Sequence, residues 1–248
     1  MILTVDIGNT TIALTVLERG ERDYSAVFAE KLPSEKGALE RFALPCDISI
    51  ERAVLSSVVP ELTEGVCRAV ERIIGKAPAV LSAKDCKTLR FAVPEPERVG
   101  FDRIADSAWA AARYPLPAVT VDLGTATTFN VIGEGGVFLG GVIAAGLQIS
   151  LDALSERAAK LPRLVAAVPE RLIGLDTAEC MLSGSVIGAA AMIDGITVRV
   201  EAELGKPVSL ILTGGGAALA EPFLRHSRVY EPLLLAKGLA YIGGGALD

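Results

Sequence analysis

The chain carries one short pattern twice, half a chain apart. Residues 3–16 read LTVDIGNTTIALTV and residues 119–132 read VTVDLGTATTFNVI, and a shift of 116 positions aligns them. The shift places Asp6 on Asp122 and Gly8 on Gly124. Apolar and β-branched residues around a glycine turn predict a strand–turn–strand hairpin in each place. The repeat therefore predicts two related lobes that bring their hairpins to a cleft between them.

Each hairpin places an aspartate at the end of an apolar strand. A carboxylate there is costly to bury unless a cation or a hydrogen-bond donor lies beside it. Asp-x-Gly is also a common turn sequence, so either hairpin alone can be read as an ordinary polar turn. Its recurrence in register favours a charged ligand shared by the two lobes.

Length and charge limit the possible classes of protein. A chain of 248 residues with 51% hydrophobic residues can bury a large core, as one large or two small domains. The formal net charge of −6 gives no support to a nucleic-acid or membrane partner. A small anionic substrate can still bind through local donors.

The cysteines and the single histidine argue against metal and triad chemistry. Cys46, Cys67, Cys86 and Cys180 form no C-x-x-C pair, which predicts free buried thiols in a reducing cytoplasm. His226 lies in a polar stretch and is expected at the surface. One histidine leaves neither a zinc site nor a Ser-His-Asp triad.

No segment of the sequence suggests secretion or a membrane span. The chain begins with a predicted strand containing Asp6, so no signal peptide is expected. The most apolar helical segment, residues 181–193, is too short to cross a bilayer before Asp194 interrupts it. We therefore expect a cytoplasmic protein.

The first lobe is predicted to span residues 1–99 and to have a ribonuclease-H-like order of elements. After the hairpin we expect a strand at 24–32, a helix from Ser34 through Phe42, a strand at 53–59, a helix at 61–74 and a strand at 79–81. Residues 91–99 read as the connection to the next lobe.

The second lobe is predicted to span residues 100–248. It opens with a helix whose apolar stripe is Phe101, Ile104, Ala105, Ala108, Trp109 and Ala112, which leaves Asp102, Arg103 and Asp106 off that stripe. Strands are expected at 119–123, 127–132, 137–144 and 208–212. Helices are expected from Gln148, at 177–204 with Asp176 as cap and Glu179 in a capping box, and at 233–242.

A strand-end carboxylate followed by a loop of Gly, Asn and Thr suits a nucleoside triphosphate. Backbone N–H groups and hydroxyls can hold phosphate oxygens, while carboxylates hold the accompanying cations or their waters. The chain has no GxxxxGK[ST] and is no P-loop enzyme. Residues 213–216, TGGG, leave too little chain for a dinucleotide domain, so this turn is expected to accept a nucleotide's base and ribose.

Eight motifs in order resemble those of the type III pantothenate kinases, and the similarity covers essentially the whole chain. They are DIGNT (6–10), SSVVP (56–60), GFDR (100–103), DLGTATT (122–128), GGVIAAG (140–146), KLP (160–162), GLDT (174–177) and TGG (213–215). The family belongs to the acetate kinase, sugar kinase, Hsp70 and actin superfamily. The resemblance implies ATP-dependent phosphorylation of the terminal hydroxyl of pantothenate, the first step toward coenzyme A.

The resemblance also implies roles for individual residues. ATP would be bound by Asp6, Ile7, Gly8, Asn9, Thr10, Thr11, Ile12, Ala13, Gly124, Thr125, Thr213, Gly214 and Gly215. Pantothenate would be bound by Val93, Gly100, Phe101, Asp102, Arg103 and Thr177, with Asp102 as the catalytic proton acceptor. Asp122 would bind a monovalent cation, K⁺ or NH₄⁺, and Mg²⁺ would accompany ATP.

The residues alone leave the role of Asp102 open. Without the family pattern, a first-turn aspartate beside an arginine such as Arg103 is more often a helix cap or part of a surface pair. The helix dipole favours its ionised form and predicts a weak base. Phosphoryl transfer depends mainly on positioning and charge neutralisation, so a weak base would suffice.

Two departures from the family pattern leave rival functions open. Val93 stands where the family usually has a substrate-contacting tyrosine, and Ala145 stands where proline is usual. Val93 motivates a divergent kinase acting on another hydroxylated small molecule. The other rivals are a non-catalytic ATP-binding accessory protein, which intact Asp102 and Arg103 oppose, and a ribonuclease-H-like nuclease, which the acidic balance opposes.

The helix predicted at 177–204 suggests a homodimer. Gly184, Gly188 and the alanines at 189–191 keep one face thin, so a second copy can pack closely there. The resemblance implies that Thr177 reaches substrate in the neighbouring subunit. On sequence alone, Thr177 can equally be a residue that only begins a helix.

Overall fold

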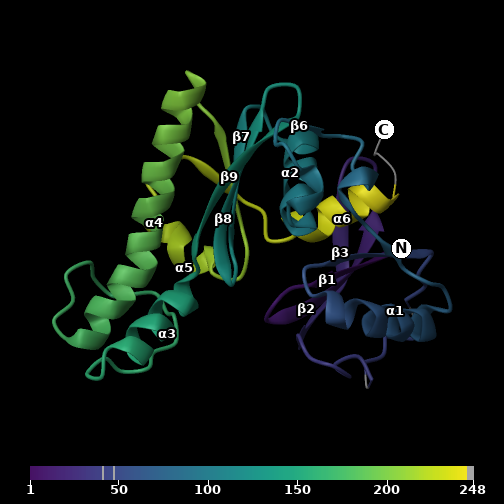
Figure 1. Cartoon of the computed structure of the whole chain (residues 1–248), viewed down its shortest axis with the longest axis horizontal. Coiled ribbons are helices and arrows are strands. Elements are labelled where there is room, and N and C mark those ends of the chain that lie inside the picture. The colour runs from purple at the N-terminus through teal and green to yellow at the C-terminus, as the bar shows by residue number, and fades with distance from the viewer. Residues whose placement is uncertain (41, 47, 245–248) are drawn as a thin grey trace. The chain divides into compact units, whose positions relative to one another are not determined.

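The computed structural model describes residues 1–40, 42–46 and 48–244 of the chain (Figure 1). The chain forms two compact units. The first contains residues 1–112 and the C-terminal residues from 233, and the second contains residues 113–232.

The first unit is built on a sheet in the order β3-β2-β1-β4-β5. Its strands are β1 (Ile2–Ile7), β2 (Thr11–Arg19), β3 (Tyr24–Pro33), β4 (Arg52–Ser57) and β5 (Ala79–Val80). β1 is antiparallel to β2 and parallel to β4. The two short segments β6 (Arg90–Phe91) and η2 (Pro96–Arg98) follow η1 (Ala83–Asp85).

One face of this sheet packs on helix α1 (Pro60–Ile74). Leu3, Val5 and Ile7 alternate along β1 with more polar residues and pack in one buried cluster with Leu62 and Val66 of the helix. Pro60 stands in the first turn, where its missing N–H costs nothing. The predicted helix at 61–74 is confirmed.

The other face packs on α6 (Leu234–Gly244), which lies beside α2 (Phe101–Arg113) (Figure 1). A side chain at Gly238 would collide with the backbone of Ala105, so glycine sets how closely the two helices approach. The Trp109 ring lies 5.6 Å from that of Tyr24 and 5.7 Å from that of Tyr241. This packing ties α2 to the first unit.

The second unit repeats the order of the first, as β9-β8-β7-β10-β11. Its strands are β7 (Ala118–Leu123), β8 (Ala126–Gly133), β9 (Val137–Ala145), β10 (Ser209–Thr213) and β11 (Arg228–Tyr230). Its helices are α3 (Leu147–Arg157), α4 (Thr177–Leu204), α5 (Ala217–Ala220) and η3 (Glu221–Phe223). The prediction of an α/β protein with two related ribonuclease-H-like lobes is confirmed.

Helix α4 provides much of the second unit's core. Val186, Ala190 and Ile193 pack in one buried cluster with Val121 of β7 and Leu212 of β10. Asp176 Oδ1 accepts from Glu179 N–H at 2.8 Å, which confirms the predicted cap. Glu179 Oε2 accepts from Leu175 N–H, one residue before the cap, so the predicted capping box is formed only in its first half. By length and composition alone, this helix is long and apolar enough to cross a membrane. The sequence did not suggest this, because its longest apolar run has only 13 residues. The core helix of a soluble protein meets the same criteria.

The structure corrects several local predictions. Residues 34–40 form turns instead of a helix, with Gly37 at φ +81°. Asp106, predicted off the apolar stripe, is only 1% exposed, because residues 104–110 of α2 are buried on all sides. Ala112, predicted on the stripe, is exposed near the end of the helix. Strand β11 was not expected. His226 is half-buried, with Nε2 3.2 Å from Glu201 Oε1.

The thiols and the boundary between units also differ from expectation. All four cysteines are free, but only Cys86 is buried, while Cys46 and Cys180 are exposed. The boundary expected at residues 99 and 100 differs from that of the compact units, which place α2 and α6 with the N-terminal sheet. Both helices, which the sequence assigned to the second lobe, thus belong to the compact unit of the first sheet.

Candidate active site

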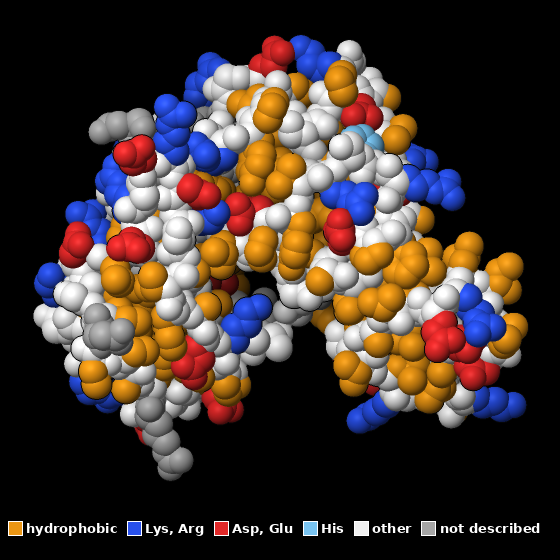
Figure 2. All heavy atoms as spheres, turned by 180° about the vertical axis from the view of Figure 1, so that it is seen from behind, with side chains coloured by type: hydrophobic (Ala, Val, Ile, Leu, Met, Phe, Trp, Pro, Cys, Tyr) orange, Lys and Arg blue, Asp and Glu red, His pale blue; other side chains and the backbone are white. Residues whose placement is uncertain are grey.

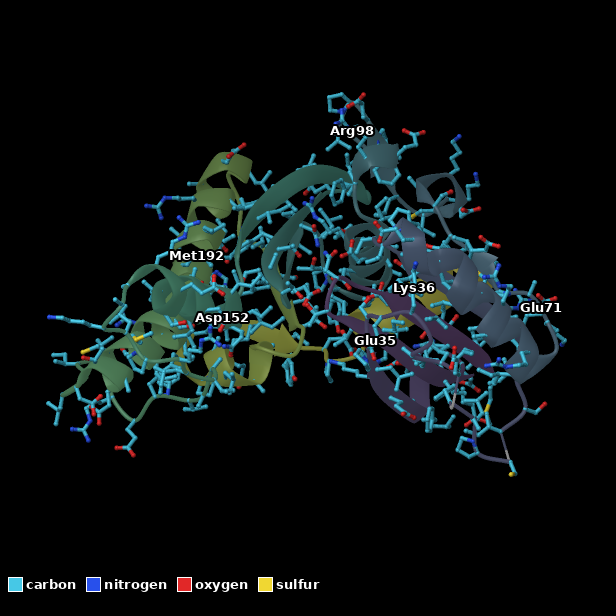
Figure 3. The ribbon with its side chains drawn as sticks, turned by 60° about the horizontal axis from the view of Figure 1, so that its bottom comes forward. Glu35, Lys36, Glu71, Arg98, Asp152 and Met192 are labelled. Atoms are coloured by element: carbon cyan, nitrogen blue, oxygen red, sulfur yellow. The ribbon has the colours of Figure 1, made fainter. Side chains whose placement is uncertain are left out.

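The turn between β1 and β2 is fixed by bonds to its own backbone and to a later segment. Gly8 N–H donates to Thr11 O at 3.0 Å, and Gly8 O accepts a 2.6 Å bond from Ser34 Oγ. Ser34 N–H donates to Thr10 O at 3.0 Å. This explains why Ser34 starts no helix: its hydroxyl supports the turn. Glu35 and Lys36 follow it on the same segment (Figure 3).

The fixed turn presents a polar surface suited to phosphate oxygens. Asn9, Thr10 and Thr11 are exposed, whereas the side chains of Ile7 and Ile12 are fully buried in the core. The two isoleucines can therefore offer a ligand only their backbone. Exposed hydroxyls and amides on a rigid turn make a preformed anion-binding surface.

Asp6 lies half-buried at the end of β1. Its register partners are Ala13 on β2 and Ser56 on β4. Register partners on neighbouring strands project to the same face of a sheet. Ser56, which the sequence placed in a motif without assigning it a role, therefore stands beside this carboxylate.

Asp102 lies in the first turn of helix α2 and is held against the helix backbone. Arg103 N–H donates to Asp102 Oδ1 at 2.8 Å, and a side chain at Gly100 would collide with that same oxygen. Burial raises the pKa of Asp102, and the bond from Arg103 N–H together with the Arg103 charge opposes this without reversing it. The expectation of a weak base is thus wrong, because burial outweighs the stabilisation of the charged form at the helix start.

Gly100 and Arg103 complete this corner of the first unit. Burial lowers the pKa of the Arg103 guanidinium, and the Asp102 charge opposes that shift. Phe101 is 6% exposed and packs in the core, while Val93 is half-buried in the segment after β6. The carboxylate of Asp102 is therefore the group of this corner best suited to accept a proton.

The second unit contains the matching turn, which Gly146 and Gly214 approach closely. Gly124 N–H donates to Ala126 O at 3.0 Å, and Gly146 N–H donates to Thr125 O at 3.2 Å. Side chains at Gly146 and Gly214 would collide with Gly124 O and with Asp122 Oδ1 respectively. Gly124 and Thr125 remain exposed. Asp122, the turn and the Gly214 segment thus form one continuous site.

Gly214 gives a direct test of this packing. It has φ +89°, and an added Cβ would also come within 2.7 Å of Leu123 N. Gly214→Ala is expected to lower the free energy of unfolding by roughly 1–3 kcal/mol, because both backbone strain and collision oppose it. Urea unfolding followed by circular dichroism measures this. Gly215→Ala is the control, since nothing lies within 4 Å of its added Cβ; equal losses would contradict the account.

Thr177 lies at a different place in the second unit. It is exposed at the start of α4 and lines a hollow of about 660 Å³ between α3 and α4, with Gly174, Cys180 and Gly184. Of the described residues, Asp122, Gly124 and Thr125 do not line this hollow.

A side-chain hydrogen bond spans one turn of helix α3. Asp152 Oδ1, labelled in Figure 3, accepts a 2.8 Å bond from the Gln148 amide four residues earlier.

The carboxylates suit a metal ion that arrives with its substrate. In the described part of the chain, no three His, Cys, Asp or Glu side chains gather as a metal site. Asp6 and Asp122 each stand singly at a strand end beside a polar turn. One carboxylate plus substrate phosphates is how Mg²⁺ is usually bound, so these residues fit a cation held jointly with a nucleotide.

The strands of the two units follow the same order, and each unit has an Asp-x-Gly turn, so the chain has a duplicated α/β architecture of two ribonuclease-H-like lobes. Comparison with known proteins identifies the family. The model of the type III pantothenate kinase family matches residues 2–199. The chain belongs to the type III pantothenate kinase family.

Full-length relatives agree with this assignment. The type III pantothenate kinase of Moorella thermoacetica is 37% identical over 98% of both chains. That of Desulfosudis oleivorans is 35% identical over 99% of this chain and 100% of its own. A crystal structure from Campylobacter jejuni, titled a putative Baf family transcriptional activator, superposes with a TM-score of 0.61 at 19% identity, over 97% of this chain and 96% of its own. At that identity it supports the fold alone.

Proposed function

We propose that this chain transfers the γ-phosphoryl group of ATP to the terminal hydroxyl of pantothenate, the first step of coenzyme A biosynthesis. The match to the type III pantothenate kinases over nearly the whole chain carries the proposal. Kinases of this kind use ATP with a divalent metal ion, which we take to be Mg²⁺. The turns described above supply the polar groups that such chemistry requires.

Each unit has its own share of the ATP contacts in this proposal. In the first unit, residues 6–13 hold phosphate oxygens through the turn that Ser34 fixes, with Asp6 facing the magnesium ion or its waters. In the second, Gly124 and Thr125 contact ATP, and residues 213–215 accept the base and ribose. The bound ion neutralises phosphate charge, and the protein's groups position the phosphates around it.

Asp102 acts as the proton acceptor for the pantothenate hydroxyl. Its raised pKa makes the carboxylate a better base than an aspartate in water, and the bond from Arg103 N–H fixes one of its oxygens. Val93, Gly100, Phe101 and Arg103 complete the acceptor side. A valine in place of the family's usual tyrosine removes one possible hydrogen bond to substrate.

Asp122 binds a monovalent cation, K⁺ or NH₄⁺. A carboxylate next to a triphosphate would repel it, and an intervening cation removes that repulsion. Activity at fixed Mg²⁺ is expected to rise at least about tenfold when K⁺ replaces Na⁺ at matched ionic strength, which corresponds to about 1.4 kcal/mol. Initial rates in the two salts measure this. Equal rates would refute the monovalent-cation role.

The active unit is a homodimer in which Thr177 reaches the neighbouring subunit's substrate. Added side chains at Gly184 and Gly188 would meet nothing within 4 Å in the described chain, so this strip of α4 has room for a partner. Leu172, Ile173 and Leu175 nearby are 67%, 80% and 76% exposed. Figure 2 shows hydrophobic side chains gathered at its lower right, over α3 and the first turns of α4. An exposed apolar patch of this kind is typical of an interface.

An acceptor panel tests the proposed substrate against the divergent-kinase alternative. The protein is incubated with ATP, Mg²⁺ and K⁺ and with pantothenate or other small hydroxylated acids, and ADP release gives kcat/KM for each. Pantothenate is expected to give the highest value. A higher kcat/KM for another acceptor would assign the chain to that substrate. We also infer action in the cytoplasm, where ATP and pantothenate are available.

A further inference from the structure

Ser56 has a buried hydroxyl beside the Asp6 carboxylate, and none of the described residues hydrogen-bonds to it. Ser56 is 0% exposed, and its Oγ has no hydrogen-bond partner in the described part of the chain. A buried hydroxyl without a partner costs free energy, so such groups are rare in proteins and are found where function requires them.

The sheet fixes what this hydroxyl can reach. Ser56 of β4 is the parallel register partner of Asp6 of β1, in a ladder that runs unbroken from Ile2 with Arg52 to Ile7 with Ser57. Strands in a ladder lie about 4.8 Å apart and their register partners share a face, so the hydroxyl and the carboxylate are neighbours. An ionised carboxylate has about four lone-pair sites and can accept this bond alongside its others.

The second unit repeats this pairing. Thr213 of β10 is the parallel register partner of Asp122 of β7 and is 3% exposed. Each strand-end aspartate thus has a buried hydroxyl residue on the next parallel strand. Ser56 and Thr213 both lie outside the two aligned hairpins, so this recurrence is independent of the sequence repeat.

We propose that Ser56 is a positioning residue whose hydroxyl, unpartnered in the described part of the ligand-free chain, donates a hydrogen bond to Asp6 when Mg·ATP binds and holds the carboxylate in the orientation that receives the magnesium ion. The inference rests on the proposed function in one respect, the role of Asp6 in the ATP site. A carboxylate held by a donor on one side presents its other oxygen to the cation, and the buried hydroxyl gains a partner in the same step, so the hydrogen bond stabilises the bound state.

Calorimetric titration of the full chain with ATP tests this, in the presence of Mg²⁺ and again with EDTA. Ser56→Ala is expected to raise the Kd of Mg·ATP about tenfold or more, the usual effect of losing a hydrogen bond to a charged group. The Kd of metal-free ATP is expected to stay at the wild-type value. Because the variant deletes an unpartnered buried hydroxyl, its melting temperature is expected to equal or exceed that of the wild type.

Ser57 provides the matched control on the next residue of the strand. Its hydroxyl is already used: it donates to Val59 O at 3.2 Å and accepts from Val59 N–H at 3.1 Å and from Thr63 Oγ1 at 2.8 Å. Ser57→Ala is therefore expected to lower the melting temperature and to leave the Kd of Mg·ATP unchanged. Ser56→Cys, close in volume but a poor donor, is expected to behave as Ser56→Ala does.

An unchanged Kd of Mg·ATP in Ser56→Ala overturns the proposal, as does an equal loss for ATP with and without Mg²⁺. A Kd shift of the same size in Ser57→Ala also overturns it, because the effect would then belong to the strand as a whole. Should Ser56→Ala fold poorly, Ser56→Cys provides the same comparison. The assay contains no pantothenate, so a wild type that binds Mg·ATP without phosphorylating pantothenate refutes the proposed function while Ser56 is still tested.

Discussion

Asp102→Asn is expected to lower kcat by about 10²- to 10⁴-fold, the usual contribution of a positioned proton acceptor. Asparagine keeps the size and polarity of the side chain but cannot accept the substrate's proton. The affinity for Mg·ATP is expected to stay near the wild-type value, because the carboxylate acts on the acceptor. Steady-state kinetics with pantothenate and calorimetry with Mg·ATP measure the two effects separately.

The raised pKa of Asp102 adds a pH dependence with a definite sign. In the folded protein this carboxyl holds its proton to higher pH than in the unfolded chain, so its ionisation costs stability as the pH rises through that range. Asp102→Asn removes this cost, and its melting temperature is expected to match or exceed the wild type near neutral pH. Wild-type turnover is expected to fall as the pH drops through the raised pKa.

Glu61 supplies the control for Asp102. It is likewise an acidic residue in the first turn of a helix, α1 of the same unit, and is exposed. Glu61→Gln removes a similar favourable interaction with the helix dipole and is expected to leave kcat unchanged. Near-normal turnover in Asp102→Asn would show that Asp102 is only a helix cap or a surface group.

Mixing two inactive variants is expected to restore activity if Thr177 acts across a dimer. Asp102→Asn lacks the proton acceptor, and Thr177→Tyr fills the start of α4 with a bulky ring. When equal amounts are unfolded and refolded together, half of the dimers contain one subunit of each kind. In each mixed dimer one site carries both changes and the other carries neither. About a quarter of the wild-type activity is expected to return, since one site in four is then intact.

The opposite arrangement gives a distinct result. If Thr177 acts on its own subunit's substrate, every site in a mixed dimer keeps one of the two changes, and the mixture remains inactive. Thr177→Tyr refolded alone and Asp102→Asn refolded alone give the background rates. Analytical ultracentrifugation of each sample checks that dimers form, because a monomeric chain would contradict the proposal before any rate is measured.

Local and repeated patterns predicted most of the fold. The 116-residue repeat predicted two related lobes, and the order of the five strands in the first unit recurs among the five strands of the second. The long helix at 177–204 with its Asp176 cap was predicted to the residue, since helical period and capping chemistry are both encoded locally. Helical period likewise predicted the helix at 61–74, which begins one residue earlier, at Pro60.

The remaining features depend on contacts between residues far apart in the chain. Ser34 has the signature of a helix cap, yet its hydroxyl binds Gly8 O, 26 residues earlier. Asp106 lies off the apolar stripe of α2 but is buried, because neighbouring elements cover that face too. The neighbour of Asp6 follows from strand register, so Ser56 could be recognised only after β1 and β4 were paired.

The predicted base strength of Asp102 failed for a related reason. The helix dipole is a local property and can be read from a sequence, whereas burial is set by the whole fold. Roles of the acceptor-side residues depended on the family resemblance, since Val93 and Thr177 carry no local signature of substrate binding.

Mass spectrometry of the reaction product is the most direct measurement of the central claim. The protein is incubated with ATP, Mg²⁺, K⁺ and pantothenate, and fragmentation of the product locates the added phosphoryl group. The account predicts phosphopantothenate with the phosphate on the terminal hydroxyl, formed by the wild type and strongly reduced in Asp102→Asn. A folded wild-type protein that binds Mg·ATP and yields no phosphopantothenate would contradict it.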